Sequence, residues 1–494
     1  MGSATIDSAM VDAVIDAVIV GGGPSGAAAA ITLARAGRSV VVIDKAAFPR
    51  DKCCGDGLTT LAVRELAPLG LDPSAIPNWR AVRDVWLRSP SGREVHLRMP
   101  EGGTFAATAP RAELDAALFE LARRAGATTI ERTAVVGVDD RRDHVVVTVD
   151  DGSGGRTEIA ARFVVAADGM WSPTRKLLGL GEQGYLGEWH AVRQYASGVS
   201  GPAADRLHVW FEPDLLPGYA WSFPLPGGRV NLGYGVPRSS ARRGADLRAE
   251  WATLLTRPHI AAALGPDVVL EGRHAAWPIP AAVDRVVLAS GRVLFVGDAA
   301  RATDVMTGEG IGQALLTGRL AAEAIEHGIA RRMSDAASVA RAYERTVRRE
   351  LVADHRMSTV LNRMLARPLL ARGAVRVSGS ATSPDATSCA GCSRTSRVPS
   401  PSRPAAGTDT SSANPRRCPD SAVPGGAGRP TPARHPAGGY RRSHGTAHTP
   451  YRPARHRASR DARRDGRRQL SPSRRCGQRR RRHRHARSQH DVHR

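Results

Sequence analysis

The sequence is short of cysteine, of long apolar runs and of any basic leader, and each shortage excludes a class of protein. Only two of its six cysteines, Cys53 and Cys54, precede residue 371, which excludes a disulfide-stapled domain and favours a reducing cytoplasm. No apolar run of about 18 residues is free of glycine or charge, so we expect no membrane-spanning helix. Residues 1–16 carry acids and no basic segment, which predicts no secretion signal.

Phe, Ile, Met, Trp, Lys and Glu are all missing from residue 371 onward, although Arg is abundant there. That segment holds 28 Arg against 6 Asp, and Leu470 is its single Leu. So little apolar surface does not offset the entropy lost on ordering, and we expect a disordered basic tail over 371–494. The preceding body is nearly neutral, with 43 basic and 41 acidic residues, and is long enough for a large core.

The basic tail is open to three interpretations. Its densest part, RRQLSPSRRCGQRRRRHRHARS, is typical of segments that neutralise nucleic-acid phosphates. A solvated extension without a partner has the same composition. We favour a third interpretation, a frame-shifted translation, because codons for DATSCAGCSRTSR can spell a sequence typical of a folded helix end when shifted by one base. Nucleic-acid binding is the interpretation that we favour least.

A glycine-rich turn between two apolar strands gives the first sign of chemistry. DAVIVGGGPSGAAAAITLARAGRSVVVID reads as strand, turn, helix and strand, and Gly21, Gly23 and Gly26 form G-x-G-x-x-G. Glycine there permits the turn, lets the main chain approach a pyrophosphate, and lets helix and strand pack closely. Asp44, 18 residues after Gly26, is placed to accept from ribose hydroxyls and repels a 2′-phosphate. The site therefore suits FAD or NAD rather than NADP.

Two later segments end a buried strand in an acid beside a glycine. FVVAADG ends in Asp168 and Gly169, and RVLFVGD ends in Gly297 and Asp298. A carboxylate at the carboxyl edge of a strand can bind the hydroxyls of a flavin side chain, although such an Asp-Gly pair is more often a plain turn. TGEGIGQ, residues 307–313, lets the main chain pass close to a flat ring.

These three segments in this order resemble the FAD-dependent oxidoreductases with the p-hydroxybenzoate hydroxylase-type fold. The resemblance implies FAD as the cofactor, and Arg111, which leads the helix expected over 110–126, resembles the family arginine beside the FAD phosphates. It places the cofactor on Gly21, Gly23, Pro24, Ser25, Gly26, Asp44, Lys45, Arg50, Cys54, Gly55, Arg111, Asp168, Gly169, Gly297, Asp298, Gly308, Gly310, Ile311 and Gly312.

Two further motifs narrow the resemblance. FPRDKCCGDGLT is similar to the FPR-x-K-x-CGDG segment of the geranylgeranyl reductase family, whose members saturate carbon-carbon double bonds in isoprenoid chains. YAWSFPLPGGRVNLGYG also fits that family, and a plain hairpin with a Pro-Gly-Gly turn explains the same alternation. The resemblance implies a substrate-binding role for Tyr219, Trp221, Phe223, Pro224, Gly233 and Gly235.

Cys54 is the residue that the resemblance makes a candidate catalyst. Saturating an alkene needs a hydride on one carbon and a proton on the other. Cys54 can supply that proton, line the pocket or be structural, and we expect Arg50 and Lys52 either to lower its pKa or to hold a phosphate. A disulfide between Cys53 and Cys54 is an alternative, although it is strained. No motif predicts a metal.

We expect an α/β protein with a discontinuous Rossmann-like FAD-binding domain, an inserted antiparallel substrate sheet and a disordered tail. A final helical segment precedes the tail and is expected on the outside of the body. The expected boundaries are 14–80, 106–188 and 286–332 for the FAD domain, 81–105 and 189–285 for the substrate sheet, 333–370 for the C-terminal helix and 371–494 for the tail.

The leading hypothesis is an FAD-dependent reductase of an isoprenoid or another apolar small molecule. The alternative is a flavin-dependent monooxygenase or halogenase of the same fold. No second nucleotide fingerprint occurs in the sequence, so the electron donor is left open between NAD(P)H and ferredoxin. We expect a cytoplasmic protein, compatible with peripheral contact to the inner face of the membrane.

Overall fold

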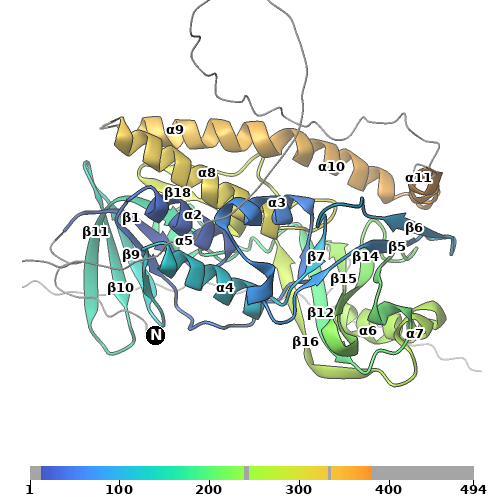
Figure 1. The fold of residues 1–494 in the computed structure, drawn as a ribbon. Coiled ribbons are helices and arrows are strands. Elements are labelled where there is room, and N and C mark those ends of the chain that lie inside the picture. Colours follow the sequence, from blue (N-terminus) through green and yellow to red (C-terminus); the bar gives the residue numbers. More distant parts are fainter. Residues whose placement is uncertain (1–12, 239–243, 332–334, 381–494) are drawn as a thin grey trace, which may run out of the picture. The chain divides into compact units, whose positions relative to one another are not determined.

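The computed structural model describes residues 13–238, 244–331 and 335–380. The centre of its larger sheet is parallel (Figure 1). Strands β11 and β2 flank β1, and β18 and β8 lie on their outer sides. The order is β17 (Ala289–Ser290), β18 (Val293–Phe295), β11 (Arg156–Ala166), β1 (Ile15–Val20), β2 (Val40–Ile43) and β8 (Thr128–Ile130), and β10 (Val145–Asp150) and β9 (Ala134–Asp140) extend it from β11.

Helices cover this sheet because its central strands are apolar on both faces. All residues of β2 and β18 are buried, as expected for parallel strands. The alanine-rich face of α2 (Pro24–Arg35) lies against β1 and against α8 (Ile311–Ala330), since small side chains let helix axes approach closely. The remaining helices of this part are α3 (Thr60–Leu69), α4 (Arg111–Arg124) and α5 (Pro173–Leu177).

The second sheet is mostly antiparallel and alternates buried and half-buried positions. Its order is β16 (Val269–Ile279), β12 (Trp189–Ser197), β15 (Arg229–Pro237), β14 (Tyr219–Leu225), β13 (Leu207–Trp210), β5 (Asp84–Arg88) and β6 (Glu94–Arg98). Helices α6 (Gly244–Leu255) and α7 (Pro258–Leu264) pack at one end of it. A small sheet of β3 (Gly57–Leu58), β7 (Ala107–Thr108) and β4 (Arg80–Ala81) connects the two larger ones.

The last described elements are helical and run from α8 toward the edge strand β6 (Figure 1). They are α9 (Ala336–Val347), a π-helical turn over Arg348–Val352, α10 (Ala353–Leu365) and α11 (Pro368–Ser380). Helix α11 passes residue 371, where the sequence predicted the start of a disordered tail. The reason is tertiary packing, since Ala371 and Val375 are one turn apart and both are buried. Residues 381–494 lie outside the described residues.

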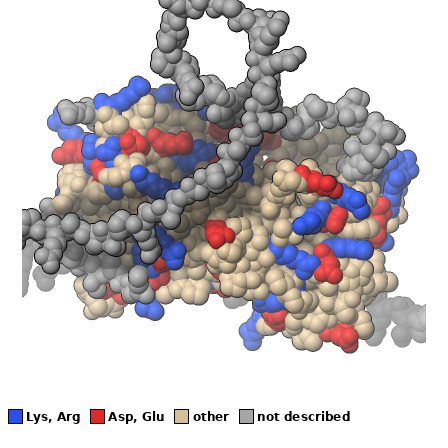
Figure 2. All heavy atoms as spheres, viewed as in Figure 1, with Lys and Arg blue, Asp and Glu red and all other residues tan. Residues whose placement is uncertain are grey.

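The fold confirms the predicted class, an α/β nucleotide-binding sheet made of separated segments with a largely antiparallel sheet inserted. Figure 2 shows both signs of charge scattered over the visible face of the described residues, which agrees with the nearly neutral body. No helix among the described residues is long and apolar enough to cross a membrane.

Candidate active site

The glycine turn after β1 forms a tight cradle that a larger residue would break. Gly21 has φ +103°, and a Cβ there would lie 2.4 Å from the carbonyl oxygen of Ala167. A Cβ on Gly26 would lie 1.8 Å from the carbonyl oxygen of Gly21. Gly23 is open by contrast, and its nearest neighbour is the guanidinium of Arg50, 3.4 Å from the position of a Cβ. The open side of the cradle therefore faces a cation.

Asp44 ends β2 and fixes the same cradle. Its Oδ2 accepts from the Gly22 N–H at 2.8 Å, and its Oδ1 accepts from the Ala46 N–H at 2.9 Å. Each oxygen has a second lone pair, which leaves capacity for ribose hydroxyls. The neighbouring Lys45 is exposed.

The three segments expected to hold the cofactor converge in the structure. Gly21 packs against Asp168, because a Cβ on Gly21 would lie 3.3 Å from the Asp168 Cα. A Cβ on Gly297 would lie 2.9 Å from the Ser25 Oγ, so the late Gly-Asp pair meets the first turn of α2. Residues separated by almost 300 positions thus share one strand edge, as the parallel pairing of β1, β11 and β18 requires.

Asp168 has the character of a ligand-binding carboxylate. Its Oδ2 accepts from the Thr174 N–H at 2.8 Å, while its Oδ1 is buried with no hydrogen-bond partner among the described residues. Burial raises the pKa of this carboxyl above its ordinary value. A buried acceptor without a partner is costly unless a bound group donates to it.

The segment before α8 supplies main-chain groups at the same edge. Gly297 and Asp298 lie in a 3-10 turn, Gly297–Ala300, and a Cβ on Gly310 would lie 3.8 Å from the Asp298 Oδ1. The Gly312 N–H donates to the Glu309 carboxylate at 2.9 Å. The predicted residues Gly308, Gly310, Ile311 and Gly312 therefore form the loop and first turn of α8 beside Asp298. These features, with the glycine cradle and the Asp168 oxygen, fit a bound dinucleotide such as FAD.

Arg111 leads α4 as predicted, but its charge is directed into a buried ion pair. Its guanidinium donates twice to Asp115, at 2.8 Å to each oxygen, and Asp115 is fully buried. Arg50 reaches the same carboxylate at 3.2 Å and also lies beside Gly23. Of these two cations, Arg50 is therefore the one that adjoins the open cradle, and the phosphate role expected of Arg111 stays a prediction.

The cysteine loop, residues 53–57, packs between the two sheets, and both of its thiols are free. Burial raises the pKa of Cys54 above its ordinary value, and the nearby charge of Arg111 opposes this only in part. Burial likewise raises the pKa of Cys53 to about 11. Of the two roles left open for Arg50 and Lys52, lowering the pKa of Cys54 is wrong, because Arg50 is paired with Asp115 and desolvation outweighs the cations, while the phosphate role stays a prediction.

Lys52 connects the cysteine loop to the late Gly-Asp segment. Its Nζ lies 3.9 Å from the Asp298 carboxylate and 4.2 Å from the ring centroid of Trp277. Burial lowers the pKa of Lys52. The lysine thus holds the thiol loop close to the edge where the three segments meet.

Asp56 is a site residue that the sequence analysis missed. Its side chain is fully buried, and burial raises its pKa to about 6. The carboxylate accepts hydrogen bonds from the Tyr195 hydroxyl at 2.6 Å, the Asn231 amide at 2.8 Å and the Arg111 main-chain N–H at 3.1 Å. Asn231 also donates to the Cys54 carbonyl at 2.9 Å. The signal was an acid between two glycines directly after the cysteine.

The aromatic residues of β14 form a wall along the cysteine loop. Trp221 and Phe223 lie 3.5 Å and 3.3 Å from the position of a Cβ on Gly55, and Phe223 lies 2.8 Å from that of a Cβ on Gly57, so glycine at position 57 lets the loop approach the wall. On β15, Gly233 pairs with Trp221 and would place a Cβ 2.2 Å from its ring. The alternation that places Tyr219, Trp221 and Phe223 on one face is confirmed by these contacts.

The ends of this wall make two further contacts. The Tyr219 hydroxyl donates to the Thr307 carbonyl, which joins β14 to the glycine loop before α8. Gly235 pairs with Tyr219 across the two strands. Pro224 lies on the opposite face, where its carbonyl accepts from the Thr108 hydroxyl at 2.5 Å. Pro224 therefore supports the small sheet and does not line the wall.

Known proteins share both the sequence and the fold of this region. The model of a family described as an FAD-binding domain matches residues 14–316. Menaquinone reductase of Mycobacterium tuberculosis is 38% identical over 338 residues, 64% of this chain and 78% of that protein. Digeranylgeranylglycerophospholipid reductase 2 of Methanopyrus kandleri is 30% identical over 329 residues, 63% of this chain and 78% of that protein.

A solved structure agrees with the fold. The crystal structure of a geranylgeranyl bacteriochlorophyll reductase-like protein from Thermoplasma acidophilum superimposes with a TM-score of 0.64 at 23% identity. The match covers 74% of this chain and 91% of that one. Identity at this level supports the architecture and carries no conclusion about the reaction.

Proposed function

Because the chain belongs to the geranylgeranyl reductase family of FAD-dependent oxidoreductases, we propose that it saturates carbon-carbon double bonds in the prenyl chain of a lipid. Its cofactor is FAD, which supplies a hydride when bound in its reduced form. The observation that carries the proposal is the position of the cysteine loop, which contacts Asp298 of the expected FAD-binding edge through Lys52 and the aromatic wall through Gly55.

The role of Cys54 in this reaction is to give a proton. Cys54 would give its thiol proton to one alkene carbon, while bound reduced FAD would supply the hydride for the other, and the resulting thiolate would regain a proton from water. Burial keeps the thiol protonated at neutral pH, as a donor requires, and the charge of Arg111 opposes the rise in its pKa. The charge of Arg111 lies close enough to stabilise the thiolate that is left.

The surrounding side chains position the thiol and select an apolar substrate. Trp221 and Phe223 give the loop an apolar boundary that suits a polyene rather than a sugar or a peptide. The names of the two relatives, a menaquinone reductase and a digeranylgeranylglycerophospholipid reductase, refer to substrates of that kind. We therefore propose that the substrate is a lipid with a prenyl chain: a prenylated quinone, a prenyl diphosphate or a prenyl ether lipid.

An anaerobic turnover experiment tests the proposal. The purified protein, loaded with FAD and reduced with a stoichiometric amount of dithionite, is mixed with geranylgeranyl diphosphate, which has no redox-active ring that could reoxidise the flavin. We expect the flavin to reoxidise without oxygen, and the product mass to rise by two hydrogens for each bond reduced. Flavin that reoxidises only when oxygen enters, with an oxygenated product, would refute the reductase and support the monooxygenase or halogenase alternative.

A matched pair of cysteine variants tests the proton donor. Cys54→Ala is expected to retain FAD and to lower the rate of alkene reduction by about 10²–10⁴-fold, the usual contribution of a general acid. Cys53→Ala is the control, and its rate is expected to stay within a few fold of the wild type. Equal rates for both variants would show that Cys54 is not the proton donor.

A further inference from the structure

Helices α10 and α11 expose apolar side chains where most helices bury them. Met357, Val360, Leu361 and Met364 recur at the spacing of one helix face, yet all four are exposed, Met357 to 60%. The exposed apolar residues of α11 continue this surface, with Leu369 exposed to 76% and Val377 to 67%. We call this surface the α10–α11 face, which comprises Met357, Val360, Leu361, Met364, Leu369, Leu370 and Val377.

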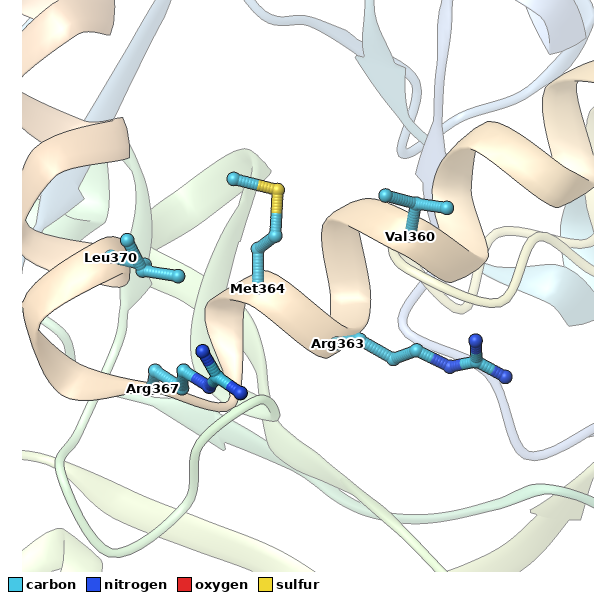
Figure 3. Close-up of a pocket in the computed structure, with 5 residues that line it drawn as sticks. All are labelled: Val360, Arg363, Met364, Arg367 and Leu370. Carbon is cyan, nitrogen blue, oxygen red and sulfur yellow. The ribbon is translucent and has the colours of Figure 1, made fainter.

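The α10–α11 face is also cationic. Residues 355–380 include five arginines, Arg356, Arg363, Arg367, Arg372 and Arg376, and no Asp or Glu. A hollow of about 260 Å³ between the two helices is lined by Val360, Arg363, Met364, Arg367 and Leu370. Figure 3 shows these five side chains on α10, α11 and the turn between them. A partner for this face must therefore be apolar and negatively charged.

Two protein partners, residues 381–494 of the same chain and a second copy of the chain, fit this face poorly. Residues 381–494 carry 26 Arg against 6 Asp and a single Leu, so they offer like charge and almost no apolar surface. A second copy would bring its own five arginines against these five. Both arrangements place positive charge against positive charge in an apolar contact.

We propose that the α10–α11 face lies on a membrane that contains anionic lipids, with the apolar side chains among the acyl chains and the arginines at the phosphates. This geometry is typical of basic amphipathic helices at bilayer surfaces, and long arginine side chains extend readily to the headgroups. The inference deepens the proposed function and rests on it for its choice of partner, since a prenyl lipid resides in a bilayer. It requires no spanning helix, and none exists among the described residues.

Vesicle flotation tests the apolar part of the proposal with charge held constant. The full chain, loaded with FAD, is mixed with phosphatidylcholine vesicles with or without phosphatidylglycerol, in the absence of substrate. Met357→Ser, Met364→Ser and Leu369→Ser combined are expected to lower the partition coefficient by about tenfold or more. The matched control combines Leu177→Ser, Val269→Ser and Val287→Ser, three exposed apolar residues elsewhere, and is expected to float like the wild type.

Hydrogen exchange locates the contact and separates it from binding by the basic residues 381–494. We expect peptides within 355–380 to exchange more slowly when phosphatidylglycerol vesicles are present. Vesicle-bound protein with unchanged exchange over 355–380 would overturn the proposal, and so would a serine triple variant that floats like the control. If the protection of these peptides from exchange increases with protein concentration in the absence of vesicles, the face binds a second copy of the protein instead. Each readout is independent of turnover, so failure of the reductase proposal leaves these results interpretable.

Discussion

A single buried carboxylate, Asp56, organises the contacts around the candidate thiol. Its partners come from three separate elements, Tyr195 on β12, Asn231 on β15 and Arg111 on α4. The same Asn231 binds the Cys54 carbonyl, so one acid fixes both the loop and the strand behind it. Burial of an ionised group opposes folding, and this opposition has a measurable dependence on pH.

We predict that Asp56 makes the protein less stable as the pH rises from about 4 to about 6. Its folded pKa of about 6 exceeds the ordinary value of 3.8, so the folded state holds the extra proton in that window and loses the advantage above it. Relative to Asp56→Asn, the wild-type free energy of unfolding is expected to fall by roughly 3 kcal/mol across the window, as measured by urea denaturation.

The control for this measurement is Asp267→Asn, which removes an exposed carboxyl far from the site. A difference between wild type and Asp56→Asn that stays flat from pH 4 to 6 would contradict the buried, proton-binding carboxyl.

Asp115 is expected to be the most sensitive acid of the ion pairs. It is fully buried between Arg111 and Arg50, so Asp115→Asn leaves a buried charge unpaired. We predict a loss of about 3–5 kcal/mol in the free energy of unfolding. Glu120→Gln in the same helix weakens two partly exposed pairs, with Arg123 and Arg124, and is expected to cost less than about 1 kcal/mol. Similar losses for the two variants would contradict the burial.

Residue roles were predictable from the sequence where they depend on local pattern, and not where they depend on burial. The glycines of the first turn and the acid Asp44 were located by spacing alone. The direction of the Cys54 pKa was not, because nearby cations in the sequence proved to be paired with acids and the sulfur is desolvated. Asn231 lies on the same face as Gly233 and Gly235, a period of two that was visible and left unused.

At the scale of elements, the hairpin of β14 and β15 shows how glycine shapes the aromatic wall. We predict that Gly233→Ala destabilises the protein by about 1–3 kcal/mol, since its Cβ would lie 2.2 Å from Trp221 and 2.5 Å from the Val192 carbonyl. Gly155→Ala is the control, because nothing lies within 4 Å of its Cβ. Equal melting temperatures for the two variants would show that Trp221 can move aside at no cost in stability.

Helix and strand boundaries were predictable from the spacing of apolar residues and from the glycines and prolines that end these elements. The glycine turn, the strand that ends before Asp168 and the alternating hairpin were all predicted at nearly the observed positions. Helix α11 was missed because its stabilising contacts are tertiary, through two buried residues among basic ones.

At the scale of the whole molecule, cofactor and fold are linked, because the cradle joins segments from both ends of residues 14–316. We predict that FAD at 100 times its dissociation constant raises the free energy of unfolding by about 2.7 kcal/mol. Thermal unfolding with FAD and with riboflavin at the same concentration tests the glycine turn, since riboflavin lacks the phosphates that this turn is expected to bind. An equal rise with both ligands would contradict a role for the turn.

The assembly of the domain from separate segments was predictable, because three motifs in a fixed order resemble a known arrangement. Their convergence on one strand edge depends on the parallel pairing of β1, β11 and β18, which no local pattern specifies.

That pairing also sets the timing of maturation in the cell. The strand that completes the cofactor edge, β18, and the helix that closes over α2 are synthesised about 280 residues after the glycine turn. The nascent chain therefore leaves the ribosome with its nucleotide cradle unfinished for most of translation. We therefore expect loading of the flavin to be a late event, and a chain truncated before residue 293 not to retain FAD.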